Sequence, residues 1–180
     1  TVGEAPERII VVGSVEEVTA LKVEDGDKVG YITQTTLSMD DTAEIIEALK
    51  KRYPKIKGPA KDDICYATQN RQNAVKALSK EVELVLVVGA QNSSNSVRLL
   101  EVAKTTGVKA RRIESAAELK AEWLEGVRNI GITAGASAPE DIVQGIITEL
   151  RKMSSSSQVR DLEIVREDVT FALPAALRTV

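Results

Sequence analysis

A cluster of short polar side chains follows an apolar run in residues 85–96, which read VLVVGAQNSSNS. Five of the seven residues after Gly89 carry small hydroxyl or amide groups, namely Asn92, Ser93, Ser94, Asn95 and Ser96. Ser and Asn are good helix N-caps, but one helix needs only one cap. Short neutral donors beside a helix N-terminus also suit phosphate oxygens, because they supply hydrogen bonds without a competing charge. We therefore expect an anion-binding turn here.

Three other segments repeat the same plan of an apolar run, a polar turn and a helical pattern. They read GYITQTTLSMDDTAEIIEAL, ICYATQNRQNAVKAL and IGITAGASAPEDIVQGII. The plan places each polar turn at the carboxyl end of a strand, where parallel α/β folds bind their ligands. It also places each turn before a helix N-terminus, whose free N–H groups and dipole attract anions.

Some residues of these turns have a structural explanation as well as a functional one. The segment Ser137-Ala138-Pro139-Glu140 has the pattern of a capping box, with Ser137 as the N-cap. Gly135 before it would let the backbone come close to a ligand, so capping and binding both stay open for Ser137. Ser38 is expected to cap the next helix, whereas Thr35 and Thr36 have no evident structural need for a hydroxyl.

Cys65 is the only cysteine and histidine is absent. A single cysteine excludes an internal disulfide framework and fits a reducing compartment, so we expect a cytoplasmic protein. A lone cysteine is more often a buried structural thiol, but Cys65 lies at a strand-to-helix junction like the other polar turns. A metal centre would need thiolates that this chain lacks, and proton chemistry would have to use carboxylates, hydroxyls, water or the thiol.

The elements that position these turns alternate between short apolar runs and helical patterns. Runs without polar alternation indicate strands buried on both faces, and the alternation predicts parallel sheets with right-handed crossovers. The expected strands are 9–12, 29–32, 64–67, 84–88, 109–113 and 130–134. The expected helices include apolar residues near 18–21, 45–49, 74–78, 99–103, 116–120 and 142–150. The polar segment 55–63 is the expected domain boundary, and 154–157 a flexible linker before a tail, 162–177, that adds a strand or packs elsewhere.

The composition excludes several classes of protein. The net charge is −3 with both signs interspersed, which gives no footprint for nucleic acid or for an anionic membrane surface. No apolar run approaches the roughly 18 residues of a membrane span, and we expect no signal peptide. The phosphate-binding patterns GxxxxGK[ST] and GxGxxG are both missing.

Several long segments resemble, in the same order, the signature segments of the LytB/IspH family of 4-hydroxy-3-methylbut-2-enyl diphosphate reductases. They are TQTTLSMDDT, DDICYATQNRQNAV, VLVVGAQNSSNSVRL, GITAGASAPEDIVQ and EDVTFALPAALR, and the resemblance runs from about Thr1 to Arg178. It implies three similar α/β domains around a central 4Fe-4S cluster. By this resemblance 1–62 is most of the second domain, 63–152 the third, and 153–180 a C-terminal tail.

The resemblance also implies an activity, the last step of the non-mevalonate route of isoprenoid biosynthesis. That step reduces (E)-4-hydroxy-3-methylbut-2-enyl diphosphate to isopentenyl and dimethylallyl diphosphate, with electrons from a ferredoxin- or flavodoxin-type donor. Cys65 matches the third cluster cysteine, and Thr35 matches a threonine near the substrate hydroxyl. Residues that match the diphosphate-binding positions are Ser93, Ser94, Asn95 and Ser137.

The chain departs from the family pattern at its beginning. The other two cluster cysteines, the diphosphate-binding histidines and the proton-delivering glutamate lie in an N-terminal part that this sequence lacks. We therefore expect a partial chain that is inactive alone and needs the rest as another chain or an upstream segment. The competing hypothesis is a non-catalytic anion-binding fragment or relative without a cluster, and a weaker one is an unrelated flavodoxin-like protein.

Overall fold

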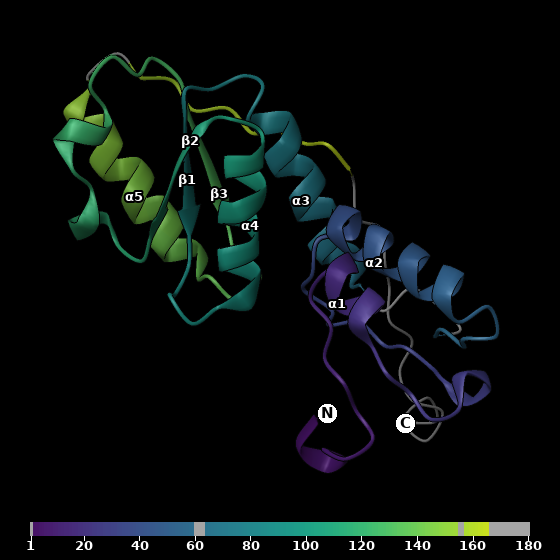
Figure 1. Cartoon of the computed structure of the whole chain (residues 1–180). Helices are drawn as coiled ribbons and strands as arrows, with labels where there is room; N and C mark the ends of the chain where they lie inside the picture. The colour runs from purple at the N-terminus through teal and green to yellow at the C-terminus, as the bar shows by residue number, and fades with distance from the viewer. Residues whose placement is uncertain (1, 60–63, 155–156, 166–180) are drawn as a thin grey trace, which may run out of the picture.

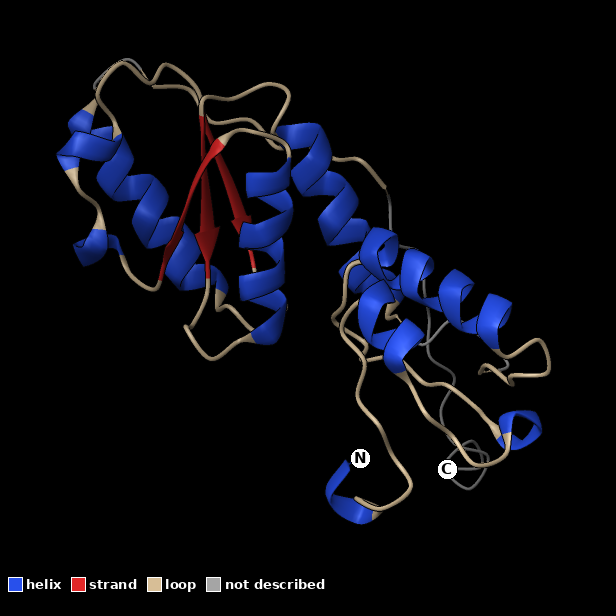
Figure 2. Ribbon diagram, viewed as in Figure 1, coloured by secondary structure: helices blue, strands red, loops and turns tan. Residues whose placement is uncertain are grey.

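A three-stranded parallel sheet forms the core of residues 64–153 in the structure, a computed structural model. The residues described are 2–59, 64–154 and 157–165. The strands, red in Figure 2, are β1 (Leu84–Val88), β2 (Lys109–Ile113) and β3 (Ile130–Ala134). Their order is β2-β1-β3, and Val88 is in register with Ile113 on one side and with Ala134 on the other. The predicted parallel α/β sheet is confirmed for these strands.

Helices cover both faces of the sheet, as Figure 1 shows. They are α3 (Tyr66–Leu78) and α4 (Ser94–Thr105) on one face and α5 (Glu140–Met153) on the other. This double cover explains why the apolar run of β1 shows no polar alternation, because every residue of that strand is buried.

The side chains of β1 alternate between two hydrophobic clusters. Val85 and Val87 join the cluster formed with α3 and α4, and Leu84, Leu86 and Val88 join the cluster formed with α5. The strand therefore contributes to both halves of the core, and the turn that follows it is held by packing on both sides.

The remaining elements are short, apart from one helix. They are η1 (Val2–Glu4), α1 (Val15–Ala20), η2 (Gly26–Lys28), α2 (Met39–Arg52), η3 (Ala116–Glu118) and η4 (Ala121–Trp123). The helix expected near residues 116–120 is thus a single 3-10 turn. In residues 2–59, α1 packs against α2, and Arg52 donates to the carbonyl of Leu21 at 2.7 Å.

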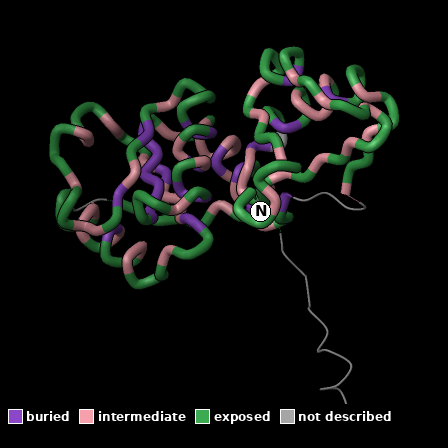
Figure 3. Tube along the Cα trace, turned by 60° about the horizontal axis from the view of Figure 1, so that its bottom comes forward, coloured by how far each residue is buried: buried purple, intermediate pink, exposed green. Residues whose placement is uncertain are grey.

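Three of the predicted strands do not form in the described residues. Residues 9–12 have no strand beside them, and 29–32 contribute only an isolated bridge between Gly30 and Lys57. Some apolar residues of these runs are exposed, by 59% for Ile10, 72% for Val11 and 65% for Ile32. An apolar run becomes a strand only when a neighbouring strand accepts its backbone hydrogen bonds, and Figure 3 shows how little of this part of the chain is buried.

The third incorrect strand, residues 64–67, is replaced by the start of α3 at Tyr66. Ile64 is buried, but Cys65 after it is the N-cap of the helix and is exposed. The run was too short to distinguish a buried helix entry from a strand.

Three further expectations lie partly outside the described residues. These are the domain boundary, which includes 60–63, the linker 154–157, which includes 155–156, and the tail, of which the structure describes only the part up to 165. Arg160, between the linker and residue 162, pairs with Glu81. Within the described ranges, no helix combines the length and the apolar character needed to cross a bilayer.

Candidate functional site

Two polar turns meet at one edge of the sheet. The chain leaves β1 through α4 to reach β2 on one side, whereas β3 lies on the other side of β1. This reversal makes the carboxyl end of β1 and β3 a topological switch point, where open α/β sheets form a crevice. The turns after Val88 and Ala134 leave neighbouring strands in register, so the sheet brings together the segments that contain Ser93 and Ser137, as predicted.

Ser93 is the N-cap of α4, and its oxygen accepts two hydrogen bonds. The donors are the backbone N–H of Ser96 at 3.3 Å and the hydroxyl of Ser96 at 3.0 Å. A serine hydroxyl has one proton and two lone pairs. With both bonds received by the oxygen, the proton of Ser93 is available for donation to an anion.

Two glycines allow the turns to approach each other around Ser96. A Cβ atom on Gly89, which has φ +154°, would lie 2.1 Å from Ser96 Oγ, and one on Gly135 would lie 2.2 Å from the same atom. The N–H of Gly135 donates to the carbonyl of Val88 at 2.8 Å. Gly135 thus permits a close approach, as expected, but its close neighbour in this chain is the Ser96 side chain. A Cβ on Gly135 would also lie 3.7 Å from Ser93 Oγ, so the two turns are in contact.

Asn95 carries a buried amide without a hydrogen-bond partner. Only 7% of the residue is exposed, and neither Nδ2 nor Oδ1 has a partner within the described part of the chain. An unsatisfied buried polar group costs about 1–3 kcal/mol, so such groups call for a specific explanation. This unpaired amide in the first turn of α4, the helix that Ser93 caps, is the strongest indication of a ligand in the described residues.

Ser137 does not cap α5. The helix begins at Glu140 with Pro139 as its N-cap and without a side-chain cap bond, so the predicted capping box is wrong. Ser137 is exposed in a turn closed by the bond from the Ala138 N–H to the Gly135 carbonyl at 3.0 Å. Pro139 displaces the start of the helix, because its ring excludes the residue before it from helical backbone angles. The Ser137 hydroxyl therefore has no capping role.

Thr35 and Cys65 lie together at a second part of the site. The N–H of Cys65 donates to the carbonyl of Thr35 at 3.2 Å, and both residues are exposed. Cys65 is not the buried structural thiol that its type favours. Ser38 caps α2 as expected, with the Asp41 N–H donating to its oxygen at 3.4 Å.

A shallow pocket of about 250 Å³ lies beside these turns. Its lining combines residues of the Thr35 segment with residues of α4 and the turn before it, namely Gln34, Thr36, Leu37, Gln91, Asn92, Ser94, Val97, Arg98 and Glu101. Of the predicted site residues it includes Ser94 alone. The pocket therefore adjoins the predicted site rather than containing it.

Sequence reasoning missed the residues that hold the β1–α4 turn. Glu114 Oε1 accepts from Arg112 at 2.7 Å and from the Gln91 N–H at 2.9 Å, and Arg112 also donates to the Gly89 carbonyl at 2.8 Å. The hydrogen bond from Arg112, followed by that from Gln91, lowers the pKa of Glu114 below its ordinary value. The sequence feature that could have indicated these contacts is the charged pair Arg112 and Glu114 at the carboxyl end of β2, the strand beside β1.

The described residues do not by themselves form a metal centre. No group of three or more His, Cys, Asp or Glu side chains gathers within them, and the whole sequence has one cysteine and no histidine. Cys65 can supply one thiolate, which is fewer than an iron–sulfur cluster requires. A cluster at Cys65 would therefore need further ligands from outside this chain.

Fold and site define an α/β protein with neutral polar turns gathered at the switch point of a parallel sheet. The model of the LytB protein family matches residues 1–151. The chain belongs to that family.

Similar curated proteins from different organisms share one protein name. The chain is 53% identical to 4-hydroxy-3-methylbut-2-enyl diphosphate reductase of Acidithiobacillus ferrooxidans, over 98% of the chain and 56% of the relative. It is 51% identical to the reductase of the same name from Azoarcus sp., over 99% of the chain and 57% of the relative. The chain thus spans about half the length of the curated relatives it matches.

A solved structure supports the fold. The E-1-hydroxy-2-methyl-but-2-enyl-4-diphosphate reductase of Plasmodium falciparum is similar with a TM-score of 0.77 and 36% sequence identity. The similarity covers 83% of this chain and 47% of that one.

Proposed function

We propose that the chain is the C-terminal part of a reductase that acts on (E)-4-hydroxy-3-methylbut-2-enyl diphosphate. The reaction breaks the C4–O bond, consumes two electrons and two protons, and releases water with isopentenyl or dimethylallyl diphosphate. Membership of the LytB family and the shared name of the relatives support this proposal. The activity belongs to the whole protein, of which this chain is about half.

The part of the reaction assigned to this chain is recognition of the diphosphate by Ser93, Ser94, Asn95 and Ser137. The buried amide of Asn95, which has no partner in the described residues, is the observation that carries this assignment. A phosphate oxygen would accept from Asn95 Nδ2 and from the free proton of Ser93. Neutral donors at a helix N-terminus bind an anion without a rival cation, and holding the diphosphate orients the distal hydroxyl.

Thr35 and Cys65 are proposed to serve the reacting end of the substrate. The bond between the Cys65 N–H and the Thr35 carbonyl keeps the two residues together. The hydroxyl of Thr35 would hydrogen-bond the C4 hydroxyl. Cys65 would contribute one thiolate to a 4Fe-4S cluster whose other ligands come from outside this chain.

The remaining parts of the proposal concern the whole protein. We retain 1–62 as most of a second domain, 63–152 as a third domain and 153–180 as a tail, with the first domain on an upstream segment or another chain. A ferredoxin- or flavodoxin-type protein would donate the electrons. The single cysteine supports a reducing compartment such as the cytoplasm.

The test of the anion site is Asn95→Ala in the full chain, with inorganic pyrophosphate as the probe. The substitution removes an unsatisfied amide and improves helix propensity, so the free energy of unfolding should be maintained or rise. Pyrophosphate affinity should fall by roughly ten-fold or more, because hydrogen bonds to charged groups contribute about 1.5–3 kcal/mol. Lower stability with unchanged affinity would show that Asn95 is structural.

A second candidate is a non-catalytic anion-binding fragment or relative without a cluster. The presence of one cysteine and no histidine favours it. Intact mass and an iron assay on the isolated material distinguish the two candidates. Iron together with a second polypeptide supports the reductase, and neither of them supports the binding fragment.

A further inference from the structure

One face of α3 is fastened to the segment that contains Thr35. The N–H of Cys65 donates to the Thr35 carbonyl at 3.2 Å, Gln72 Nε2 donates to the Leu37 carbonyl at 2.8 Å, and Lys76 Nζ pairs with Asp40 at 2.5 Å. Positions 65, 72 and 76 are seven and four residues apart, which places them on the same side of a helix. Gln72 is only 3% exposed, so its bond is shielded from water.

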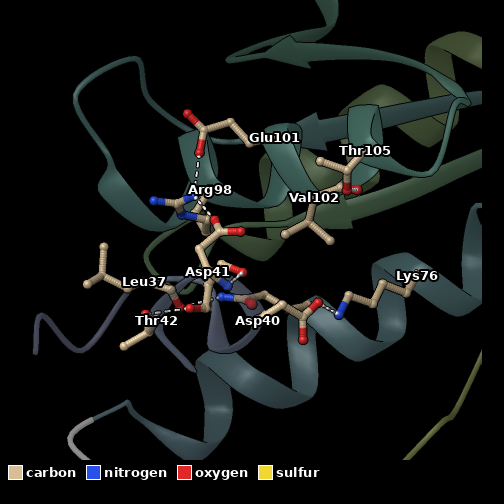
Figure 4. Close-up of polar contacts among 11 residues, drawn as sticks. Leu37, Asp40, Asp41, Thr42, Lys76, Arg98, Glu101, Val102 and Thr105 are labelled. Atoms are coloured by element: carbon tan, nitrogen blue, oxygen red, sulfur yellow. Dashed lines mark hydrogen bonds and ion pairs between the residues drawn. The ribbon is translucent and has the colours of Figure 1, made fainter. Parts of the chain in front are cut away.

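A separate contact ties the same segment to α4. Arg98 Nη1 lies 3.2 Å from Asp41 Oδ2 and 2.9 Å from Glu101 Oε2. Figure 4 shows Arg98 between these two carboxylates, with Asp40 directed toward Lys76. Only the Asp41 pair crosses between helices, because Glu101 is on α4 itself.

The positions of the paired residues connect the two parts of the proposed site. Asp41 is in the first turn of α2, three residues after the cap Ser38 that ends the Thr35 segment. Arg98 is one turn beyond Ser94 on α4, the helix that begins with the anion-binding turn. The ion pair therefore joins two helix beginnings, one attached to Thr35 and Cys65 and the other to Ser93 and Asn95.

We propose that Asp41 and Arg98 are positioning residues, whose ion pair sets the placement of the Thr35–Cys65 pair relative to the anion-binding turn of α4. The assignment of the two parts to the two ends of a substrate rests on the proposed function. The ion pair and its effect on Cys65 can be measured without that assignment. A substrate that spans both parts needs their separation fixed before it binds.

A direct role of Arg98 as an anion ligand makes the opposite prediction. If Arg98 bound the diphosphate itself, removal of Asp41 would free the guanidinium and strengthen binding. If Arg98 acts through Asp41, the same removal weakens binding even though it deletes a negative charge. The sign of the change therefore separates the two roles.

The variant to make is Asp41→Asn in the full chain, and Glu101→Gln is its matched control. Both remove one carboxylate from the same guanidinium, but only Asp41→Asn removes the contact between helices. Asp41 is 69% exposed, so the effect should be about two- to five-fold, as for a partly exposed ion pair.

The first readout is hydrogen exchange of the Cys65 amide, which donates to Thr35. Because the sequence has one cysteine, labelling with 15N-cysteine gives one backbone signal. We expect exchange to be about two- to five-fold faster in Asp41→Asn and unchanged in Glu101→Gln. The charge swap of Asp41→Lys with Arg98→Glu should restore slow exchange relative to either single change, which general loss of stability would not do.

The second readout is the affinity for inorganic pyrophosphate, which should fall in Asp41→Asn relative to Glu101→Gln. Equal exchange rates in the two variants, or tighter pyrophosphate binding in Asp41→Asn, would overturn the positioning role. If the unmodified chain binds no pyrophosphate while the exchange rates differ as stated, the proposed anion site fails and the positioning contact stands.

Discussion

Ser93 and Ser137, two of the three serines predicted to bind an anion, differ in what the fold requires of them. Ser93 caps α4 and accepts two bonds from Ser96, whereas Ser137 neither caps α5 nor bonds to another described residue. Loss of a hydroxyl at these positions should therefore have different consequences for stability. Comparison of the two separates binding from folding.

Ser137→Ala should leave the free energy of unfolding unchanged within about 0.5 kcal/mol. Ser93→Ala should reduce it by about 0.5–2 kcal/mol, the usual cost of a lost N-cap. Both should weaken pyrophosphate binding, measured by titration and compared with denaturant unfolding of the same samples. Unchanged binding in Ser137→Ala would remove that residue from the site.

Cys65 stands at the N-cap of α3 and makes no side-chain cap bond. Serine caps helices well, so Cys65→Ser should maintain or raise the stability of this chain, by up to about 1 kcal/mol. In the complete protein the same change should abolish or degrade the visible absorption of a cluster. A visible spectrum and iron content that do not change would show that the thiol has no ligand role.

At the scale of elements, two carboxylates stabilise opposite ends of the sheet. Glu114 holds the turn after β1 through Gln91, whereas Glu83 accepts from the Asn129 N–H at 2.7 Å at the amino end of β3. The pKa of Glu83 is lowered chiefly by that Asn129 bond, and the pKa of Glu114 by Arg112 and then by Gln91. Glu83 can therefore serve as a control for Glu114, because both carboxylates accept a backbone hydrogen bond but at opposite ends of the sheet.

A lowered folded-state pKa means that stability is present above the ordinary value, 4.5, and is lost as the pH falls through the folded value. Glu114→Gln and Glu83→Gln should each flatten the loss of thermal stability as the pH falls below the ordinary carboxyl value of 4.5. Only Glu114→Gln should also weaken pyrophosphate binding at neutral pH, because only Glu114 holds the turn before Ser93. Equal binding in both variants would contradict this role for Glu114.

Sequence patterns predicted the elements whose surroundings lie within this chain. The strands 84–88, 109–113 and 130–134 appear with the bounds expected, since helices of the same chain cover both sides. The runs 9–12 and 29–32 have the same apolar character, but no neighbouring strand accompanies them within the described ranges. The local sequence pattern predicts that a segment is suited to a sheet, but it does not predict whether a neighbouring strand is present.

The candidate site was predicted in part for a related reason. Ser93 and Ser137 lie in the turns that follow β1 and β3, and Asn95 is in the first turn of the next helix, so strand order brings these segments together. The contacts of Arg112 with Gly89 and of Arg98 with Asp41 join residues 23 and 57 positions apart. Such pairs depend on how helices pack, which no local spacing contains.

At the scale of the molecule, the hydrophobic core is unevenly distributed. Among those residues of 2–59 whose burial the structure describes, the buried hydrophobic ones are Val18 and Leu49, whereas all of β1 is buried. Ile10, Val11 and Ile32 are more than half exposed. We expect another part of the complete protein to cover these side chains.

The isolated chain should therefore bind anions weakly, and the amide protons of its poorly buried segments should exchange quickly. Pyrophosphate should bind with a dissociation constant near the millimolar range, on the order of −4 kcal/mol, because the proposed site is incomplete. Amide exchange should be slow in β1 and fast in 9–12 and 29–32. No reduction of the allylic diphosphate should be detectable with dithionite-driven donors.

The matching experiment adds the part of the relatives that this chain does not span, with iron and sulfide. Slow exchange in 9–12 and 29–32, a cluster and turnover should then appear together. Robust turnover from material whose intact mass shows this chain alone would contradict the proposal of a partial enzyme.

The register of β1 and β3 also fixes the distance between the starts of the two turns. Neighbouring strands lie about 4.8 Å apart, and Val88 stands opposite Ala134, so the two turns begin at that spacing whatever their loop sequences. This width is comparable with one tetrahedral oxyanion. Changes of Ser93, Asn95 or Ser137 can alter which donors reach the anion, but the distance between the starts of the two turns is set by the pairing of β1 with β3, outside those residues.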